Sequence, residues 1–216
     1  FYTAPPLNLA SKGIGEIFIG LNFGFLMTIG SFYVQTQTIN LESIVAATPV
    51  ALLIAAVLYI NEFPDYVADK AAGKWHLVVR LGRSKASIGY IMLIVATYAS
   101  ILLSVAFNIV PVYTLIGLLT VPLAILAGRF ALAYHSQTFN LIPANAATIN
   151  IHLITGLMLS IGYIISMLTS NQFLITTITT AVGGLIVARI YMKIGGSHDI
   201  AQGVKQVVTP TTTAPK

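Results

Sequence analysis

The chain has 216 residues, of which 56% are hydrophobic and only 8% are charged. Soluble domains carry about 25% charged residues, so this chain has too few of them to cover a water-facing surface. Its mean hydropathy of +0.87 excludes a disordered chain, and its lack of cysteine excludes a disulfide scaffold and thiolate chemistry. The composition therefore predicts an integral membrane protein.

Apolar stretches, each close to the roughly 20 residues that cross a bilayer, follow one another along the chain. Continuous apolar runs predict helices, because lipid offers the backbone no hydrogen-bond partners. The sequence therefore predicts an all-α protein, a polytopic transmembrane helix bundle with about six spans. The expected spans are residues 14–34, 43–60, 88–107, 112–133, 151–168 and 173–192.

The basic residues divide the linkers into two classes. Linkers 35–42, 108–111 and 169–172 contain neither lysine nor arginine, so all 11 basic residues fall on one side of a six-span arrangement. The positive-inside rule makes that side cytoplasmic. We therefore expect a multi-pass protein of the cell membrane with its charged loops and both ends of this chain in the cytoplasm. Topology and contact with the anionic lipid bilayer account for the net charge of +5, so no nucleic-acid partner is expected.

The two ends of the chain differ from the spans. Residue 1 is Phe, and residues 1–12 are polar and contain proline, unlike a signal peptide, so we expect a piece of a longer protein. Residues 207–216 are rich in threonine and proline and predict a disordered tail. The expected organisation is one helical membrane domain over residues 1–206, followed by this tail.

The longest polar insertion, residues 61–87, holds three of the six acidic residues and five of the 11 basic residues. Asp65 and Asp69 are four residues apart, so on a helix their carboxylates share one face. Pro64 suits the first position of such a helix, and Gly73 suits its end. Two carboxylates at this spacing can hold Mg²⁺, which fills its remaining positions with water and substrate phosphate.

Basic side chains follow these carboxylates. Lys70, Lys74, Arg80 and Arg83 can contact phosphate oxygens that a metal ion leaves exposed. Together these residues predict a site for an amphiphilic diphosphate at the membrane surface. Two aspartates four residues apart are a common pattern, however. The alternative is a solvated helical face, with Asp69 paired to nearby lysines and the basic residues only setting the orientation in the membrane.

Three ordered strings extend this pattern. The first is Asn61-Glu62-Phe63-Pro64-Asp65-Tyr66-Val67-Ala68-Asp69-Lys70-Ala71-Ala72-Gly73-Lys74, followed by Val79-Arg80-Leu81-Gly82-Arg83. It resembles the second aspartate-rich region of the UbiA superfamily of intramembrane prenyltransferases, above all the dihydroxynaphthoate polyprenyltransferases of menaquinone synthesis. Residues 2–16 are similar to the segment that leads into the family's fifth helix, and residues 151–157 to its LHLLFGL segment.

The resemblance implies a bundle of about nine helices around a central cavity. Two aspartate motifs hold Mg²⁺ against the diphosphate of a polyprenyl donor, and an aromatic acceptor such as dihydroxynaphthoate attacks the resulting allylic cation. By this resemblance Asp65 and Asp69 are the catalytic metal ligands, whereas Glu62 replaces an asparagine that is frequent in the family. The residues that the resemblance assigns to diphosphate binding are Asn61, Lys70, Lys74, Arg80, Tyr2 and Lys12.

The family's first motif, NDxxDxxxD, has no match in these 216 residues. We therefore expect a missing N-terminal segment or a partner subunit to complete an enzyme, and the span at 173–192 to be additional to the family's helices. The alternative is a non-catalytic helical subunit that scaffolds a membrane complex. A small transporter is less favoured, because the spans show no buried charges or obvious broken helices.

Of four further ionisable residues, two allow two interpretations each. Glu16 either pairs with Lys12, four residues earlier, or faces the mouth of a cavity. His152, near the expected start of the fifth span, is either interfacial or a proton carrier. His76 and His135 lie in loops without ligand spacing to each other, so no histidine metal site is expected.

Overall fold

The described chain is helical throughout, as its continuous apolar runs predict. The structure is a computed structural model that describes residues 2–4 and 6–170. Residues 1–166 form one compact unit, and the second unit, residues 167–216, is described only up to residue 170. The span expected at 173–192 and the tail expected at 207–216 lie outside the described residues.

The helices follow in the order of the predicted spans. They are η1 (Leu9–Ser11), α1 (Gly15–Ile19), η2 (Gly20–Leu26), α2 (Met27–Thr36), α3 (Leu41–Ala71), α4 (Leu77–Leu81), α5 (Arg83–Ala106), η3 (Val112–Thr120), α6 (Val121–Tyr134) and α7 (Thr138–Ser170). Within the described residues five helical segments are long and apolar enough to cross a membrane. They are Gly15–Thr36, Leu41–Ala71, Arg83–Ala106, Val112–Tyr134 and Thr138–Thr169, so the first five expected spans are confirmed as helices.

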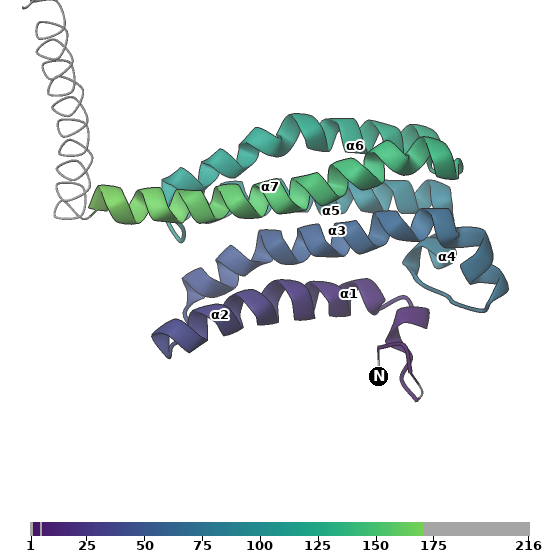
Figure 1. The fold of residues 1–216 in the computed structure, drawn as a ribbon, viewed down its shortest axis with the longest axis horizontal. Coiled ribbons are helices and arrows are strands. Elements are labelled where there is room, and N and C mark those ends of the chain that lie inside the picture. The colour runs from purple at the N-terminus through teal and green to yellow at the C-terminus, as the bar shows by residue number, and fades with distance from the viewer. Residues whose placement is uncertain (1, 5, 171–216) are drawn as a thin grey trace, which may run out of the picture. The chain divides into compact units, whose positions relative to one another are not determined.

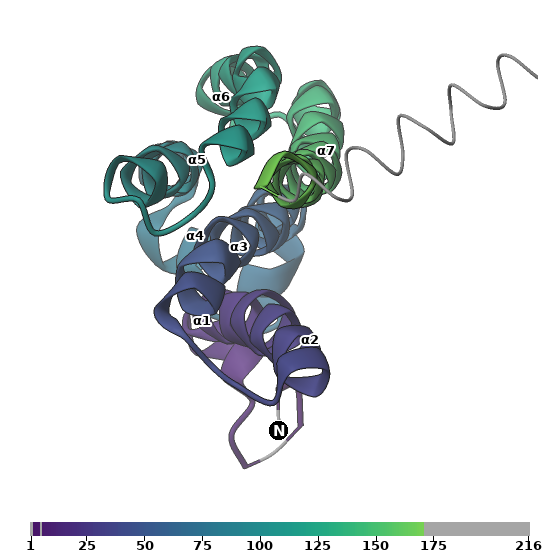
Figure 2. The same ribbon diagram turned by 90° about the vertical axis from the view of Figure 1, so that its left-hand side faces the viewer.

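Within residues 1–166, α3 lies in the middle of the bundle. The continuous helix α1–η2–α2 packs on one side of it, and α5, α6 and α7 lie on the other (Figures 1 and 2). The core joins buried side chains of α3 to those of α5, α6 and α7. Its largest fully buried members are Leu53, Ile60 and Phe63 from α3, Tyr90 from α5, and Leu141 and Ile151 from α7.

Glycine permits the close approach of the first helix to α3. A Cβ on Gly24 would lie 2.2 Å from the Cα of Ala51, and a Cβ on Gly20 would lie 3.1 Å from the Ala51 carbonyl oxygen. Both residues belong to η2, a stretch of wider π-helical turns. Small residues at such crossings let helix backbones touch in membranes. A Cβ on Gly30 would meet nothing within 4 Å, so that glycine has no such role.

The helix that carries the aspartates does not begin at Pro64, as the sequence predicted. Pro64 lies inside α3, which continues from the membrane-length segment to Ala71. Proline has no N–H to donate to the carbonyl four residues earlier, which belongs to Ile60. The side-chain Nδ2 of Asn145, on α7, donates to that carbonyl instead, at 3.2 Å. The predicted end is confirmed, since Gly73 follows α3 in the left-handed conformation with φ 74°.

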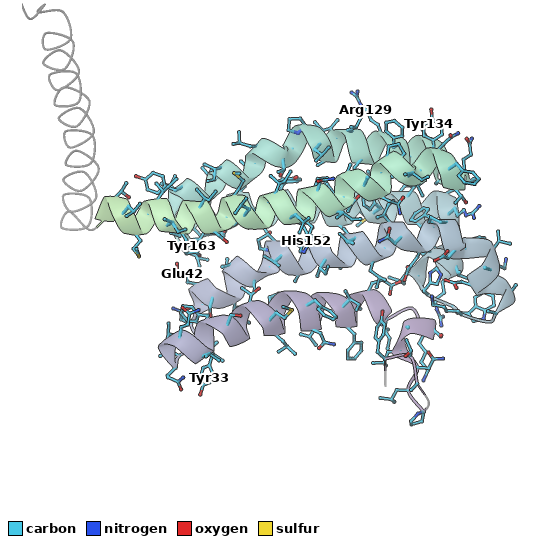
Figure 3. The ribbon with its side chains drawn as sticks, viewed as in Figure 1. Tyr33, Glu42, Arg129, Tyr134, His152 and Tyr163 are labelled. Carbon is cyan, nitrogen blue, oxygen red and sulfur yellow. The ribbon has the colours of Figure 1, made fainter. Side chains whose placement is uncertain are left out.

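A second correction concerns His152. The sequence placed it near the start of a span, but α7 begins at Thr138, so His152 lies well inside the helix (Figure 3). Its Nδ1 is buried without a hydrogen-bond partner. The polar residues ahead of it, including Asn145 and Thr148, belong to the same helix because they satisfy partners on α3 and α5.

Candidate functional site

The end of α3, the turn after it and α4 form one surface together with the N-terminal segment. The backbone N–H of Trp75 donates to the carbonyl of Ser11 at 3.1 Å. A Cβ on Gly13 would lie 2.7 Å from the side chain of Arg80, so only a glycine fits there without a shift. The residues before the first long helix are therefore held against the turn that follows the aspartates.

The two aspartates share one face of α3, because the helix continues to Ala71. Asp65 is exposed, whereas Asp69 is half-buried. The Oδ2 of Asp69 lies 3.0 Å from Nζ of Lys74 and 3.1 Å from Nε2 of His76. Both contacts use Oδ2, so neither occupies Oδ1. The ion pair between Asp69 and a nearby lysine, which the simpler interpretation expected, is therefore present. It leaves the other carboxylate oxygen of Asp69, Oδ1, unengaged by Lys74 and His76.

The other residues predicted to bind diphosphate are only partly brought together. Lys74 lies beside Asp69, but Lys70 lies over the ring of Tyr66, 5.8 Å from its centroid. The Nε of Arg80 donates to the carbonyl of Trp75 at 2.7 Å. Both side chains are therefore anchored locally, with the charged group of Arg80 exposed at the surface.

Asn61, Lys12 and Tyr2 complete the predicted set. The Oδ1 of Asn61 accepts a hydrogen bond of 2.7 Å from Asn145, so the side chain of Asn61 links α3 to α7. Lys12 is exposed. Tyr2 is half-buried, and burial together with the negative charges of Glu62 and Glu16 raises its pKa above the ordinary value. Tyr2 therefore lies near two carboxylates of the bundle.

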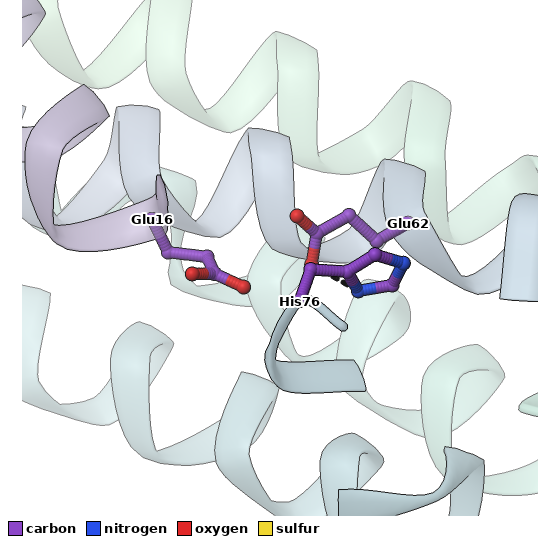
Figure 4. Close-up of side chains that lie close together, drawn as sticks. All are labelled: Glu16, Glu62 and His76. Carbon is purple, nitrogen blue, oxygen red and sulfur yellow. Dashed lines mark ion pairs between the residues drawn. The ribbon is translucent and has the colours of Figure 1, made fainter. Parts of the chain in front are cut away.

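A buried cluster of Glu16, Glu62 and His76 lies directly behind Asp69. The three residues are 3%, 7% and 0% exposed, and each offers a ligand atom within 4.8 Å of the other two. Figure 4 shows the carboxylate of Glu16 pointing toward Glu62 and His76. The Oε1 of Glu16 accepts a hydrogen bond of 2.9 Å from the backbone N–H of Leu77, which ties α1 to α4.

His76 connects this cluster to the aspartate pair. Its Nδ1 lies 3.1 Å from Oε2 of Glu62, and its Nε2 lies 3.1 Å from Oδ2 of Asp69. Burial by itself lowers the pKa of His76, but the adjacent carboxylates of Glu62 and Asp69 outweigh burial and raise the pKa above its ordinary value. The site therefore favours positive charge at this position.

The sequence did not predict this cluster. Lys12 precedes α1, and Glu16 bonds to Leu77, so the expected pairing of Glu16 with Lys12 is wrong. His76 lies in the loop before α4, as expected, and its partners are carboxylates and not His135. Acidic residues are rare next to apolar spans, so each of them is a candidate functional residue. That rarity was the signal available in the sequence. Only the fold of residues 9–16 against α4 brings the three together.

An apolar cavity of about 660 Å³ adjoins the cluster at Glu16. It lies between η2, α3 and α5, and Glu16, Tyr59 and Thr48 bring the polar groups to its wall. The remaining lining includes Leu21, Phe25, Leu52, Met92 and Ala96. Glu16 thus lines a cavity, whereas its placement at the mouth of that cavity stays a prediction. A separate cavity of about 460 Å³ lies between α5 and α6.

Membrane-length helices, a charged site at one end and an apolar cavity beside it define a polytopic α-helical membrane protein. The family model for the UbiA prenyltransferase family matches residues 1–142. The chain belongs to the UbiA prenyltransferase family, which confirms the resemblance stated above.

Similar proteins share about half of their length with this chain. The 1,4-dihydroxy-2-naphthoate octaprenyltransferase of Haemophilus influenzae is 36% identical, with 76% of this chain and 53% of the relative covered. The octaprenyltransferase of the same name from Bacillus subtilis is 29% identical, with the same coverage. The 2-carboxy-1,4-naphthoquinone phytyltransferase of Synechocystis is 27% identical, with 75% of this chain and 53% of the relative covered. Comparison with the solved structures gives no significant match.

Proposed function

We propose that this chain forms part of a Mg²⁺-dependent membrane prenyltransferase. The enzyme transfers a polyprenyl group from its diphosphate to an aromatic acceptor such as dihydroxynaphthoate, in the synthesis of a quinone. The observation that carries the proposal is the adjacency of three features: an aspartate pair on one helix face, basic side chains around it, and an apolar cavity next to them. The names of the similar proteins, which are naphthoate prenyltransferases, agree with it.

The aspartate pair fits a hard divalent cation. Asp65 and Asp69 offer carboxylate oxygens four residues apart on α3, and the contacts of Asp69 with Lys74 and His76 both use Oδ2. Mg²⁺ takes one or two carboxylates and keeps its other positions for water and phosphate. When bound, the ion neutralises charge that develops on the leaving diphosphate.

The protein's own residues perform the remaining tasks. Lys74 stands beside Asp69 and can contact a phosphate oxygen there, and the exposed guanidinium of Arg80 can do so from α4. Asn61 and Lys70 from α3, and Tyr2 and Lys12 from the N-terminal segment, complete the proposed diphosphate-binding set. The apolar cavity holds the isoprenoid chain and keeps water from the allylic cation.

The orientation in the membrane belongs to the same proposal. The N-terminal segment, the end of α3, the turn after it, α4 and the start of α5 carry six of the seven basic residues of the described chain. By the positive-inside rule this end faces the cytoplasm, where a soluble aromatic acid and a diphosphate head group can both reach the aspartates.

Substitutions in the natural gene test the proposal. Asp65→Asn and Asp69→Asn should each lower prenyl transfer in isolated membranes by about 100-fold or more, because metal-assisted neutralisation of the leaving group contributes several kcal/mol. Quinone content measured by mass spectrometry should fall in parallel. Glu42→Gln is the matched control, since Glu42 lies on the same helix at the opposite end of the bundle (Figure 3). Full turnover of both aspartate variants at limiting Mg²⁺ would contradict the site, whereas no prenyl transfer by the parent with its native partners would favour a non-catalytic helical subunit.

A further inference from the structure

Three buried polar atoms behind the aspartate pair have no hydrogen-bond partner. They are Oε2 of Glu16, Oε2 of Glu62 and Nδ1 of His76, one from each member of the buried cluster. All three residues are more than nine-tenths buried. A buried polar group without a partner costs about 1–3 kcal/mol, and more when it is charged, so three such atoms in one cluster require an explanation.

The proton on His76 is placed by Asp69. The carboxylate of Asp69 accepts from Nε2 of His76 at 3.1 Å, so Nε2 carries a hydrogen and Nδ1 is the ring nitrogen on the side of Glu62. Nδ1 lies 3.1 Å from Oε2 of Glu62, without the alignment of a hydrogen bond. Either a second proton on the ring or a metal ion must therefore lie between these two atoms.

One proton cannot satisfy the cluster, but one metal ion can. A proton on Nδ1 joins His76 to Glu62 and leaves Oε2 of Glu16 without a partner, and a proton on Glu62 joins only two of the three residues. A divalent ion accepts all three atoms and also offsets the two buried carboxylate charges. Ligand atoms on one tetrahedral Zn²⁺ ion lie about 3.3 Å apart, given bonds of about 2.0–2.1 Å. The 3.1 Å contact matches that edge, and the third residue lies within 4.8 Å of the others.

The surroundings of His76 also match those of a metal ligand. A ligating histidine nearly always donates its other ring N–H to a carboxylate or carbonyl, which fixes the tautomer and the ring orientation. Asp69 supplies that carboxylate here. Glu16 is likewise oriented, because its Oε1 accepts from the backbone N–H of Leu77 and its Oε2 is left for the cluster.

We propose that Glu16, Glu62 and His76 form a binding site for one transition-metal ion of the Zn²⁺ type, separate from the Mg²⁺ site proposed at Asp65 and Asp69. The donor set decides the class of metal. An imidazole nitrogen with two carboxylates suits Zn²⁺ and its first-row neighbours, whereas Mg²⁺ prefers oxygen ligands alone. The proposal does not depend on the proposed function, since it concerns ion binding and not prenyl transfer.

Equilibrium dialysis tests the site directly. The purified protein, freed of metal by chelation, is dialysed against buffered free Zn²⁺ with excess Mg²⁺, and bound zinc is measured by atomic emission. We expect one Zn²⁺ per chain, retained in the presence of Mg²⁺. Co²⁺ in place of Zn²⁺ should give visible absorption bands typical of mixed nitrogen and oxygen coordination, a readout that needs no variant.

Substitutions assign the ligands. Loss of a group that merely orients a ligand costs about 10–100-fold in metal affinity, so His76→Gln or Glu62→Gln should weaken Zn²⁺ binding by more than about 100-fold. His135→Gln is the matched histidine control and should bind as the parent does, because its Nδ1 contacts Ser136 outside the cluster. Circular dichroism confirms that each variant is folded.

Three results would overturn the proposal. They are a parent protein that binds no Zn²⁺ at micromolar free concentration, binding that survives in both His76→Gln and Glu62→Gln, and an equal loss in His135→Gln. Asp65→Asn separates the two proposals, since it should lower prenyl transfer and leave Zn²⁺ binding intact. Unchanged prenyl transfer in that variant would contradict the proposed function without affecting the zinc site.

Discussion

Asn145 donates a hydrogen bond to the backbone carbonyl of Ile60, the carbonyl that Pro64 leaves without a partner inside α3. The same Nδ2 donates to Oδ1 of Asn61 at 2.7 Å. A side chain of α7 therefore completes the helix that carries the aspartates, one turn before Asp65. Proline is tolerated in membrane helices where a neighbour satisfies the freed carbonyl in this way.

Replacing Asn145 should destabilise the bundle in a manner that depends on Pro64. Asn145→Ala removes a partner from a partly buried carbonyl, so we expect a loss of about 1–2 kcal/mol in the free energy of unfolding. In a Pro64→Ala background, the restored N–H bonds to Ile60 and the same substitution should cost less. The midpoint of thermal unfolding in detergent, monitored by circular dichroism, measures the cost of Asn145→Ala in each background. Asn150→Ala is the control, since Asn150 is exposed and bonds only within α7. Equal costs in the two backgrounds would contradict this role for Asn145.

The contact of Gly24 with Ala51 should be intolerant of any side chain. A Cβ on Gly24 would lie 2.2 Å from the Cα of Ala51, so Gly24→Ala must push η2 away from α3. We expect a loss of about 1–3 kcal/mol, the usual cost of overpacking. Gly30→Ala, on the same helix, should be neutral or slightly stabilising, because its Cβ meets open space and alanine favours helix. Similar midpoints of thermal unfolding for the two variants would show that η2 can move away from α3 at little cost.

Tyr90 and Thr148 should be measurably coupled. Their hydroxyls lie 2.6 Å apart in the buried core between α5 and α7. Hydrogen bonds between membrane helices average about 0.6 kcal/mol, so a cycle of Tyr90→Phe, Thr148→Val and the double variant should give a coupling of this order. The coupling energy is calculated from the free energies of unfolding of the parent, the two single variants and the double variant. A coupling of zero would mean that the hydroxyl of Thr148 is satisfied fully by the carbonyl of Ala144, which it also contacts.

Under the proposed function, filling the cavity beside Glu16 should shorten the prenyl donor that is accepted. Ala96→Phe projects a ring into the cavity between η2, α3 and α5. Each excluded CH₂ group of the isoprenoid forfeits about 0.8 kcal/mol of binding, so kcat/KM for long donors should fall about tenfold or more while short donors are less affected. Donors of graded length, assayed in membranes, supply the measurement. Ala99→Phe, on the same helix but in the cavity between α5 and α6, should leave the length preference unchanged. A parallel change in both variants would place the isoprenoid elsewhere.

The helices could be predicted from the sequence because their cause is local. An apolar run of membrane length must pair its own backbone groups, so the first five expected spans reappear as helices. Their ends could not be predicted in the same way. Pro64 suits the start of a helix, and residues 138–148 lie between two expected spans, but α3 and α7 continue through them, where α7 contacts α3 and α5.

The candidate site could be predicted only where its residues are close in sequence. Asp65 and Asp69 share a helix face by spacing alone, and Lys74 follows them near enough to pair. Glu16, Glu62 and His76 come from three separate elements, so no spacing rule links them. Their association depends on the N-terminal segment lying against α4, a tertiary contact that hydropathy and local propensity do not encode.

The hydrogen bond from Leu77 to Glu16 joins residues 61 positions apart. A ribosome adding about 5–20 residues per second needs about 3–12 seconds to make the intervening chain. During most of that interval Glu16 already stands at the end of an inserted or inserting helix, before Glu62 and His76 are made. The carboxylate must therefore remain hydrated, or hold a proton, until α4 reaches it. The order of synthesis thus makes closure of this cluster a late event in the biogenesis of residues 1–81.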